Sequence, residues 1–202
     1  MSLKAESPWY KIYDLGMDPK DILDYLVPRL EQEHGTLDFE DNFSMGKHQV
    51  WVVDNAKHLY KHVDKIHPCM DLYTTFRKEL VPSAFSFWIM PKDSGLGPHV
   101  DAKQNKGHPT PGFVIVPLQG RTETRCYGPM PDVNPHYNPK DPNSLKNNDE
   151  FTMTIDSDDL KVVDTVVYEP GDVVVINNTK YIHSVHPLDN PRIALQFSAK
   201  VW

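Results

Sequence analysis

The tripeptide His-Val-Asp occurs twice in the sequence, at residues 62–64 and at residues 99–101. A His and an Asp two positions apart can bind one metal ion only if both side chains lie on the same side of the backbone. Residues two apart on a strand share a face, whereas on an α-helix they diverge by about 200°. The element that carries each copy therefore decides whether that copy can hold a metal.

The first copy lies in a helical pattern. Residues 54–66 carry apolar side chains at helical spacing, so His62 and Asp64 diverge and we do not expect them to share an ion. His58 and His62 are four residues apart and would share a helical face. No Glu follows His58 as in His-Glu-x-x-His, and no further ligand is indicated, so this pair is the weaker alternative for a metal site.

The second copy lies among short strand patterns, where His99 and Asp101 would project from one face. A third candidate ligand, His183, lies on a later strand and shares its face with Tyr181 and Val185. Two His and one carboxylate leave open positions on an octahedral ion, which is the arrangement of non-haem Fe(II) oxygenases. We therefore predict that His99, Asp101 and His183 bind a metal.

Arg192 begins the last strand pattern, in which polar and apolar residues alternate over 192–198. If helices cover the apolar face of this strand, its polar face lines a binding cavity in the interior. In an ordinary sandwich the polar face would instead meet solvent. The planar guanidinium of an inward Arg192 can hold a carboxylate through two parallel hydrogen bonds. Asp189 is the nearest acidic residue in the sequence and is the alternative partner.

Helical periodicity dominates the first eighty residues. Helices are predicted at 18–33, 54–66 and 67–80. Asp18 is the expected N-cap of the first helix, a proline follows at its first position, and Pro28 is expected to kink or split it. We expect residues 1–82 to form a helical N-terminal layer.

From residue 84 the pattern changes to short strands separated by turn residues. The predicted strands are 84–90, 112–118, 124–128, 151–155, 162–169, 171–177, 180–185 and 191–202. Strands without intervening helices favour a sandwich or jelly roll over a parallel α/β sheet. We therefore expect a single domain, 1–202, that is mainly β, with a cupin-like double-stranded β-helix (jelly roll) at 83–202 covered by the helices.

Taken in order, these features resemble the 2-oxoglutarate/Fe(II)-dependent oxygenase superfamily over residues 84–200. The features are His-Val-Asp on a strand, Glu-Pro-Gly-Asp before an apolar strand, His183, and Arg192 nine residues later. The Pro-His-Val-Asp form is most similar to the prolyl hydroxylase and aspartyl/asparaginyl hydroxylase branches. The cupin pattern, a His-x-His pair followed by Glu, is absent. His186 is an alternative distal ligand, but alternation puts it on the opposite face from His183. His183 lies nine residues before Arg192 and His186 only six, and the spacing of nine suits the family better.

The resemblance implies a dioxygenase with Fe(II) bound by His99, Asp101 and His183, and with the far carboxylate of 2-oxoglutarate bound by Arg192. O2 would be the other co-substrate, ascorbate a supporting reductant, and succinate and CO2 the products. The enzyme would hydroxylate a C–H bond of an amino-acid side chain, protein-bound or free, or of a small metabolite. The alternative is a non-enzymatic jelly roll, structural or ligand-binding, with an incidental metal site.

The segment 128–150 holds five Pro and five Asn and has neither a helical nor an alternating apolar pattern. Such an insert within a compact domain is often a lid or a disordered loop. We interpret it as a border of the active-site mouth that helps to select the substrate; a surface excursion without function is the alternative. A loose basic set around the proposed mouth comprises Lys103, Lys106, Arg121 and Arg125.

The formal net charge of −7 argues against binding to nucleic acids or anionic membranes. No apolar run is as long as a membrane span, and the first residues lack the apolar core of a signal peptide. Two cysteines, Cys69 and Cys126, cannot form a disulfide framework. We expect a reduced, cytoplasmic protein that acts on a small molecule or a peptide, and the sequence leaves its oligomeric state open.

Overall fold

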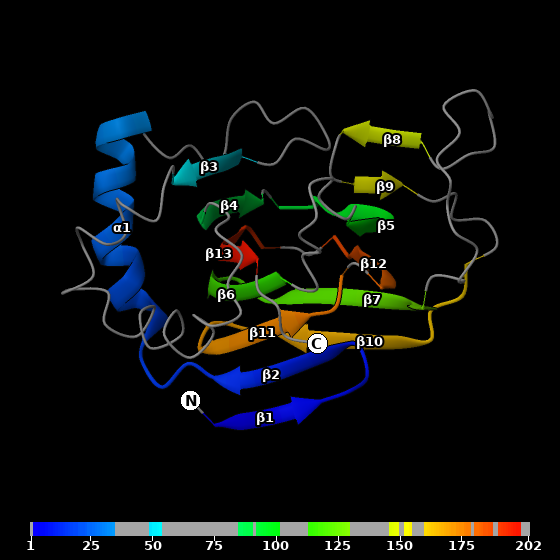
Figure 1. Ribbon diagram of the computed structural model, residues 1–202. Coiled ribbons are helices and arrows are strands. Elements are labelled where there is room, and N and C mark those ends of the chain that lie inside the picture. The colour runs from blue at the N-terminus through cyan, green and yellow to red at the C-terminus, as the bar shows by residue number, and fades with distance from the viewer. Residues whose placement is uncertain are drawn as a thin grey trace.

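The computed structural model shows a protein that is mainly β, with two antiparallel sheets and one helix in the described ranges (Figure 1). The structure describes residues 2–34, 49–53, 85–90, 92–101, 113–129, 146–149, 152–154, 160–178, 180–187 and 190–198. The predicted mainly β class is confirmed, and the paired sheets fit the predicted jelly roll.

The first sheet has seven strands. Their spatial order is β1 (Leu3–Glu6), β2 (Tyr10–Asp14), β11 (Asp172–Ile176), β6 (Phe113–Gln119), β13 (Arg192–Ser198), β4 (Phe85–Met90) and β3 (Gln49–Val53). Most neighbours in this sheet are remote in sequence; β6, for example, lies between β11 and β13. Such crossovers between strands distinguish a jelly roll from a simple meander.

The second sheet has six strands. Their spatial order is β10 (Asp164–Tyr168), β7 (Thr122–Pro129), β12 (Tyr181–Val185), β5 (Leu96–Asp101), β9 (Thr152–Thr154) and β8 (Lys146–Asp149). Each strand pattern predicted from residue 84 onward coincides with one of the observed strands. The segment 128–150, expected to be irregular, contributes Gly128 and Pro129 to β7 and the whole of β8, so the prediction was wrong at both of its ends.

Helix α1 (Pro19–His34) lies beside the seven-stranded sheet, on the side away from the other sheet, and packs against β6 (Figure 1). The Asp18 carboxylate accepts a hydrogen bond from the Lys20 amide at 2.9 Å, which confirms the predicted N-cap. The helix continues through Pro28, so the expected split is wrong. An interior proline costs roughly 3 kcal/mol, and the burial of Ile22 and Leu26 offsets this cost.

The predicted N-terminal layer, 1–82, also contains strands. β1, β2 and β3 lie within it, outside the three predicted helices. The predicted helices at 54–66 and 67–80 lie outside the described residues. No helix in the described ranges is long and apolar enough to cross a membrane.

One cluster of buried apolar residues lies between the two sheets. It joins residues of both sheets, namely Trp9, Ile12, Ile115, Cys126, Val166, Tyr168, Val174 and Ile176. Ala194 of β13 packs against this core, whereas Ile193 and Leu195, on the opposite face of β13, are buried toward α1. Because alternate residues of a strand share a face, Arg192 points with Ala194 into the space between the sheets.

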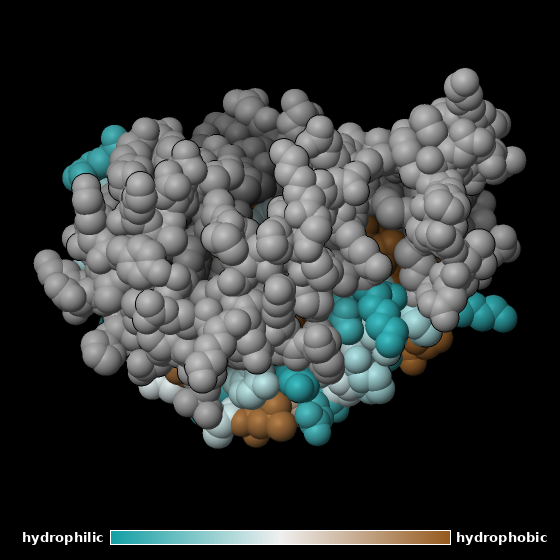
Figure 2. Space-filling model, viewed as in Figure 1, coloured by the Kyte–Doolittle hydropathy of each residue, from teal (hydrophilic) through white to brown (hydrophobic). Residues whose placement is uncertain are grey.

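The described surface along β1 and β10 mixes polar and apolar residues. Leu3, Val162, Val163 and Val167 are its exposed large apolar side chains. In the coloured part of Figure 2, apolar residues form small separate patches among polar residues. Single exposed apolar residues of this kind are common on protein surfaces.

Candidate metal centre

His99 and His183 lie side by side on neighbouring strands of the six-stranded sheet. They are directly opposite each other in the antiparallel pairing of β5 with β12. Their ring centroids are 4.3 Å apart, and the two residues are only 7% and 6% exposed. Two imidazoles at this separation can reach one metal ion, so the structure brings two of the three predicted ligands together.

Both imidazoles point into the space between the sheets. His183 is also opposite Cys126 in the pairing of β12 with β7, and opposite residues in a sheet project from the same face. Cys126 belongs to the core between the sheets. The two His side chains therefore share the interior with Arg192, which reaches it from the other sheet.

A backbone carbonyl orients each imidazole. The Nδ1–H of His99 donates to the Gly97 carbonyl at 2.7 Å, and that of His183 donates to the Tyr181 carbonyl at 3.1 Å. A carbonyl can only accept, so each neutral ring carries its proton on Nδ1 and its lone pair on Nε2. Metal-binding His residues in proteins are commonly held in this way.

Burial keeps His183 neutral. Desolvation, together with the neighbouring His99, lowers the pKa of His183 to about 3, and the bond to the Tyr181 carbonyl only partly opposes this. A neutral imidazole is the form that binds a metal. At neutral pH, His183 is therefore a ready ligand.

Asp101, the third predicted ligand, is the last residue of β5 and lies opposite Thr152 of β9. Its backbone is two positions from His99, so it takes the same face of the strand. Its side chain lies outside the described part of the structure. Among the side chains that are described, three His, Cys, Asp or Glu do not gather around one point, so the full ligand set remains a prediction.

Of the other candidate metal ligands, only His186 lies in the described part of the chain, and it does not complete a group of three with His99 and His183. His58, His62 and Asp64 lie outside the described residues. His186 follows the end of β12, and its backbone is engaged on both sides: its amide donates to the Glu123 carbonyl, and its own carbonyl accepts from Arg192.

Arg192 is a buried cation with neutral partners. It is 2% exposed, and its Nη1 and Nη2 atoms donate to the backbone carbonyls of His186, at 3.2 Å, and Ser94. Its buried Nε has no hydrogen-bond partner, and no carboxylate with a described side chain forms an ion pair with it. Burial lowers the pKa of Arg192, but guanidinium stays charged in proteins. Asp189, the alternative partner, lies outside the described residues.

Two buried hydroxyl groups accompany Arg192. The Tyr168 hydroxyl and Thr124 Oγ1 are 3.0 Å apart. Burial raises the pKa of Tyr168, while the Thr124 bond and the charge of Arg192 act in the opposite direction, which places the guanidinium within electrostatic reach of the phenol. Neither residue was predicted from the sequence, although alternation with Val166 in β10 could have indicated that Tyr168 points inward.

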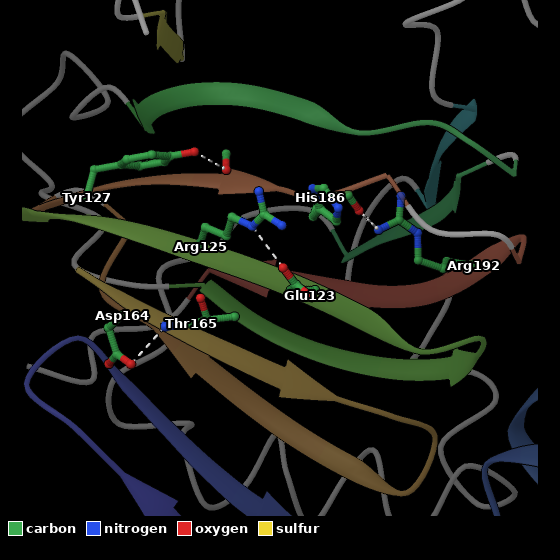
Figure 3. Close-up of polar contacts among 8 residues, drawn as sticks. Glu123, Arg125, Tyr127, Asp164, Thr165, His186 and Arg192 are labelled. Carbon is green, nitrogen blue, oxygen red and sulfur yellow. Dashed lines mark hydrogen bonds and ion pairs between the residues drawn. The ribbon is translucent and has the colours of Figure 1, made fainter. Parts of the chain in front are cut away.

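The outer face of the six-stranded sheet carries a separate set of polar contacts (Figure 3). Arg125 forms an ion pair with Glu123 at 2.8 Å, and the hydroxyl groups of Tyr127 and Ser184 are 2.9 Å apart. Arg125 lies opposite Ser184, on the face of the sheet away from His183. Arg125 therefore lies on the outer face of this sheet, and its place in the basic set around the mouth stays a prediction.

No protein-family model matches the sequence, and no curated protein is similar to it. Several solved structures share its fold. EvdO2 from Micromonospora carbonacea var. aurantiaca matches with a TM-score of 0.58 and 16% identity, over 99% of this chain and 94% of its own. A Trichoplax adhaerens prolyl hydroxylase, in complex with a hypoxia inducible factor peptide, matches with a TM-score of 0.55 and 12% identity, over 96% and 84%.

The epimerase SnoN also matches, with a TM-score of 0.55 and 14% identity, over 95% of this chain and 78% of its own. SnoN is a non-haem, alpha-ketoglutarate-dependent enzyme whose crystal structure contains Fe3+, alpha ketoglutarate and nogalamycin RO. The fold expected from the resemblance to the 2-oxoglutarate/Fe(II)-dependent oxygenases is therefore confirmed.

Proposed function

We propose that this protein is an Fe(II)- and 2-oxoglutarate-dependent dioxygenase that hydroxylates a C–H bond and releases succinate and CO2. One observation carries the proposal: a pair of oriented, buried imidazoles and a buried arginine without a described carboxylate partner face the same interior. His99, Asp101 and His183 are the metal ligands in this proposal. Arg192 binds the far carboxylate of 2-oxoglutarate.

The donor set fits Fe(II). Two neutral imidazoles and one carboxylate on a single face leave the opposite positions of an octahedral ion open for a co-substrate and oxygen. Fe(II) with 2-oxoglutarate and O2 supplies the oxidising power, and the protein supplies placement and the exclusion of water. The carbonyls of Gly97 and Tyr181 fix the two rings before the metal arrives.

Arg192 fits a carboxylate. A guanidinium whose buried Nε has no partner is costly unless an anion meets it. Tyr168 and Thr124 share one hydrogen bond, and the hydroxyl that accepts it can donate its own O–H to the same anion. A dicarboxylate that binds the metal at one end and Arg192 at the other would engage both sheets.

The reaction outcome and the primary substrate are finer proposals. The fold serves both an epimerase and a prolyl hydroxylase, so the fold alone does not distinguish hydroxylation from epimerisation. The Pro-His-Val-Asp sequence favours hydroxylation of an amino-acid side chain, protein-bound or free, and a small metabolite is the other candidate. SnoN with nogalamycin RO and the prolyl hydroxylase with its peptide represent these two kinds of substrate.

The test is conversion of 2-oxoglutarate to succinate by the purified protein with Fe(II) and ascorbate. We expect turnover and one bound divalent ion per chain in the wild type, and the loss of both in Asp101→Ala, which removes the only anionic ligand. His62→Ala, in the first His-Val-Asp copy, is the matched control and should retain both. A protein that binds no metal and forms no succinate would instead be a jelly roll without this activity.

A further inference from the structure

Three turns meet around Arg192 at one end of the sandwich. The β4–β5 turn supplies the Ser94 carbonyl and the β12–β13 connection supplies the His186 carbonyl, and both accept hydrogen bonds from the guanidinium. The third is the β6–β7 turn, which contains Gly120. Because the two acceptors are neutral, they orient the guanidinium without neutralising its charge.

Gly95 lies where the first two turns touch. A Cβ atom at this position would be 2.6 Å from the Val185 carbonyl oxygen and 2.8 Å from Pro187 Cδ. Val185 and Pro187 flank His186, and Ser94 precedes Gly95. The missing side chain therefore lets the two turns that provide the carbonyl acceptors approach each other closely.

Gly120 lies against the stem of Arg192. Its φ is +75°, a left-handed conformation that favours glycine. A Cβ atom here would collide with the Pro191 carbonyl oxygen and would lie 3.0 Å from Arg192 Cγ and 3.2 Å from Arg192 Cα. Even a methyl group would thus push directly on the residue that carries the guanidinium.

We infer that Gly95 and Gly120 are positioning residues for Arg192. Their missing side chains let the three turns close on Arg192, so that the Ser94 and His186 carbonyls hold the guanidinium in one orientation while its Nε–H remains for an anion. Both glycines should therefore control the affinity for the anion. Gly120, which lies against Arg192 and not against the strands of His99 and His183, should leave the affinity for the metal unchanged. The identity of the anion as 2-oxoglutarate rests on the proposed function. The closure of the three turns on Arg192 is independent of that function.

Gly16 provides a matched control for Gly120. Gly16 also has a φ of +75°, but a Cβ there would meet nothing within 4 Å. Gly16→Ala and Gly120→Ala therefore introduce the same backbone strain, and only the second disturbs Arg192. Gly95→Ala, at ordinary φ, tests the contact between the two turns.

The experiment is calorimetric titration of 2-oxoglutarate into each Mn(II)-loaded variant, with Mn(II) affinity measured separately. We expect Gly95→Ala and Gly120→Ala to weaken 2-oxoglutarate binding by about tenfold or more, because loosening an oriented charge contact removes much of what deleting it would remove. The Mn(II) affinity of Gly120→Ala should stay within about twofold of the wild type, since Gly120 and the His pair share no partner. Gly95 adjoins β5 and Val185 of β12, so for Gly95→Ala the expected result is a loss of 2-oxoglutarate affinity larger than any loss of Mn(II) affinity. Gly16→Ala should leave both affinities unchanged.

A second readout does not depend on 2-oxoglutarate. The Nε–H resonance of Arg192, assigned by its loss in Arg192→Lys, should move or broaden in Gly120→Ala and Gly95→Ala but not in Gly16→Ala. If this occurs while the wild type binds no 2-oxoglutarate, the proposed function fails and the positioning role stands. If the wild type binds 2-oxoglutarate and both variants bind it equally well with an unchanged resonance, the positioning role is wrong and the function stands.

Pro187→Gly covers the case in which neither alanine variant folds. Pro187 is exposed, so its replacement should preserve the fold while loosening the Gly95 contact from the other side. We expect weaker 2-oxoglutarate binding, a shifted Arg192 resonance and unchanged Mn(II) affinity. An unchanged resonance together with unchanged 2-oxoglutarate affinity in this variant would overturn the inference.

Discussion

Arg192 combines a buried positive charge with two neutral acceptors, a combination that is unstable without an anion nearby. The carbonyls of Ser94 and His186 satisfy two of its donors, but they do not compensate for the loss of water around the charge. A carboxylate that enters the interior would do so. This arrangement therefore favours a role for Arg192 in binding an anion over a purely structural role.

Replacing Arg192 tests this interpretation. We expect Arg192→Ala to keep the fold and metal binding and to weaken 2-oxoglutarate binding by roughly 2–5 kcal/mol, the cost of truncating one member of a buried charge pair. Arg192→Lys should recover only part of the affinity, because a point charge cannot make the two-pronged contact. Calorimetry with Mn(II)-loaded protein in the absence of O2 measures both. Wild-type affinity in Arg192→Ala, together with a less stable fold, would mean that an internal group such as Asp189 is the partner.

His183 should make stability depend on pH. Its pKa is near 6.5 in the unfolded chain and about 3 in the folded protein. Between these values only the unfolded state binds the proton, so stability falls as the pH drops below 6.5, by at most about 1.4 kcal/mol per pH unit. Urea unfolding of the metal-free protein at pH 7 and pH 5 measures this loss.

His183→Gln is the control for that measurement. Glutamine cannot gain a proton in this range, so the variant should lose less stability than the wild type between pH 7 and pH 5. The same loss in both proteins would show that other groups cause the pH dependence and that His183 is not held neutral by burial.

At the scale of elements, both ends of the insert 128–150 lie beside the candidate metal centre. It begins at Pro129 of β7, opposite Tyr181, and ends beyond β8, which pairs with β9. Strand β9 in turn pairs with the part of β5 that carries Asp101. Both ends of the insert therefore lie at the same end of the sheet as Asp101.

We expect replacement of residues 131–145 by a short Gly/Ser linker to leave uncoupled turnover of 2-oxoglutarate intact, because the ligands and β8 remain. Coupled oxidation of the true substrate should fall, since the insert borders the proposed mouth. Succinate formation measured with and without substrate separates the two effects. Unchanged coupled kinetics would mean that the insert is a surface excursion.

The sequence predicted the elements of the jelly roll better than it predicted their partners. Alternation identified the strands that carry His183 and Arg192, because the side-chain period of a strand is a local property. The strand of His99 was inferred only from the strand patterns around it. Alternation could not predict that His99 and His183 lie directly opposite each other, since this register is set by pairing between distant segments. The two carbonyl groups that accept hydrogen bonds from Arg192 could not be predicted for the same reason.

Of the strands that were missed, β1, β2 and β8 have weak local signals, whereas β3, QVWVV, consists largely of strand-forming residues and could have been predicted. β1 and β2, with the sequences LKAE and YKIYD, are short and contain lysine, and β8 reads KNND. Their hydrogen bonds come from pairing with neighbours, β2 with β11 and β8 with β9. Strand formation here depends on tertiary context rather than on intrinsic propensity, so a reading of local pattern favoured helix or loop.

At the scale of the whole molecule, the two sheets are tied together near their β2 and β10 edges. Trp9, in the connection from β1 to β2, donates through Nε1 to the Asp164 carboxylate of β10 at 2.7 Å. Trp9 is 2% exposed and belongs to the core between the sheets. Because Trp9 comes from one sheet and Asp164 from the other, this bond helps to fix their separation.

Trp9→Phe should therefore destabilise the sandwich while sparing the metal centre. Phenylalanine keeps an aromatic ring in the core but removes the donor, and a hydrogen bond to a charged group contributes about 1.5–3 kcal/mol. Trp9 and the Thr165 amide donate to the two different carboxylate oxygens of Asp164. Asp164→Asn keeps only one acceptor oxygen, so it can retain the bond from Trp9 only by losing the weaker bond from the exposed Thr165 amide, and it should cost less than Trp9→Phe. Urea unfolding measures both variants, and Mn(II) affinity, expected to stay near the wild-type value, shows whether the His99–His183 pair survives. A Trp9→Phe variant as stable as the wild type would mean that apolar packing alone holds the sheets together at this edge.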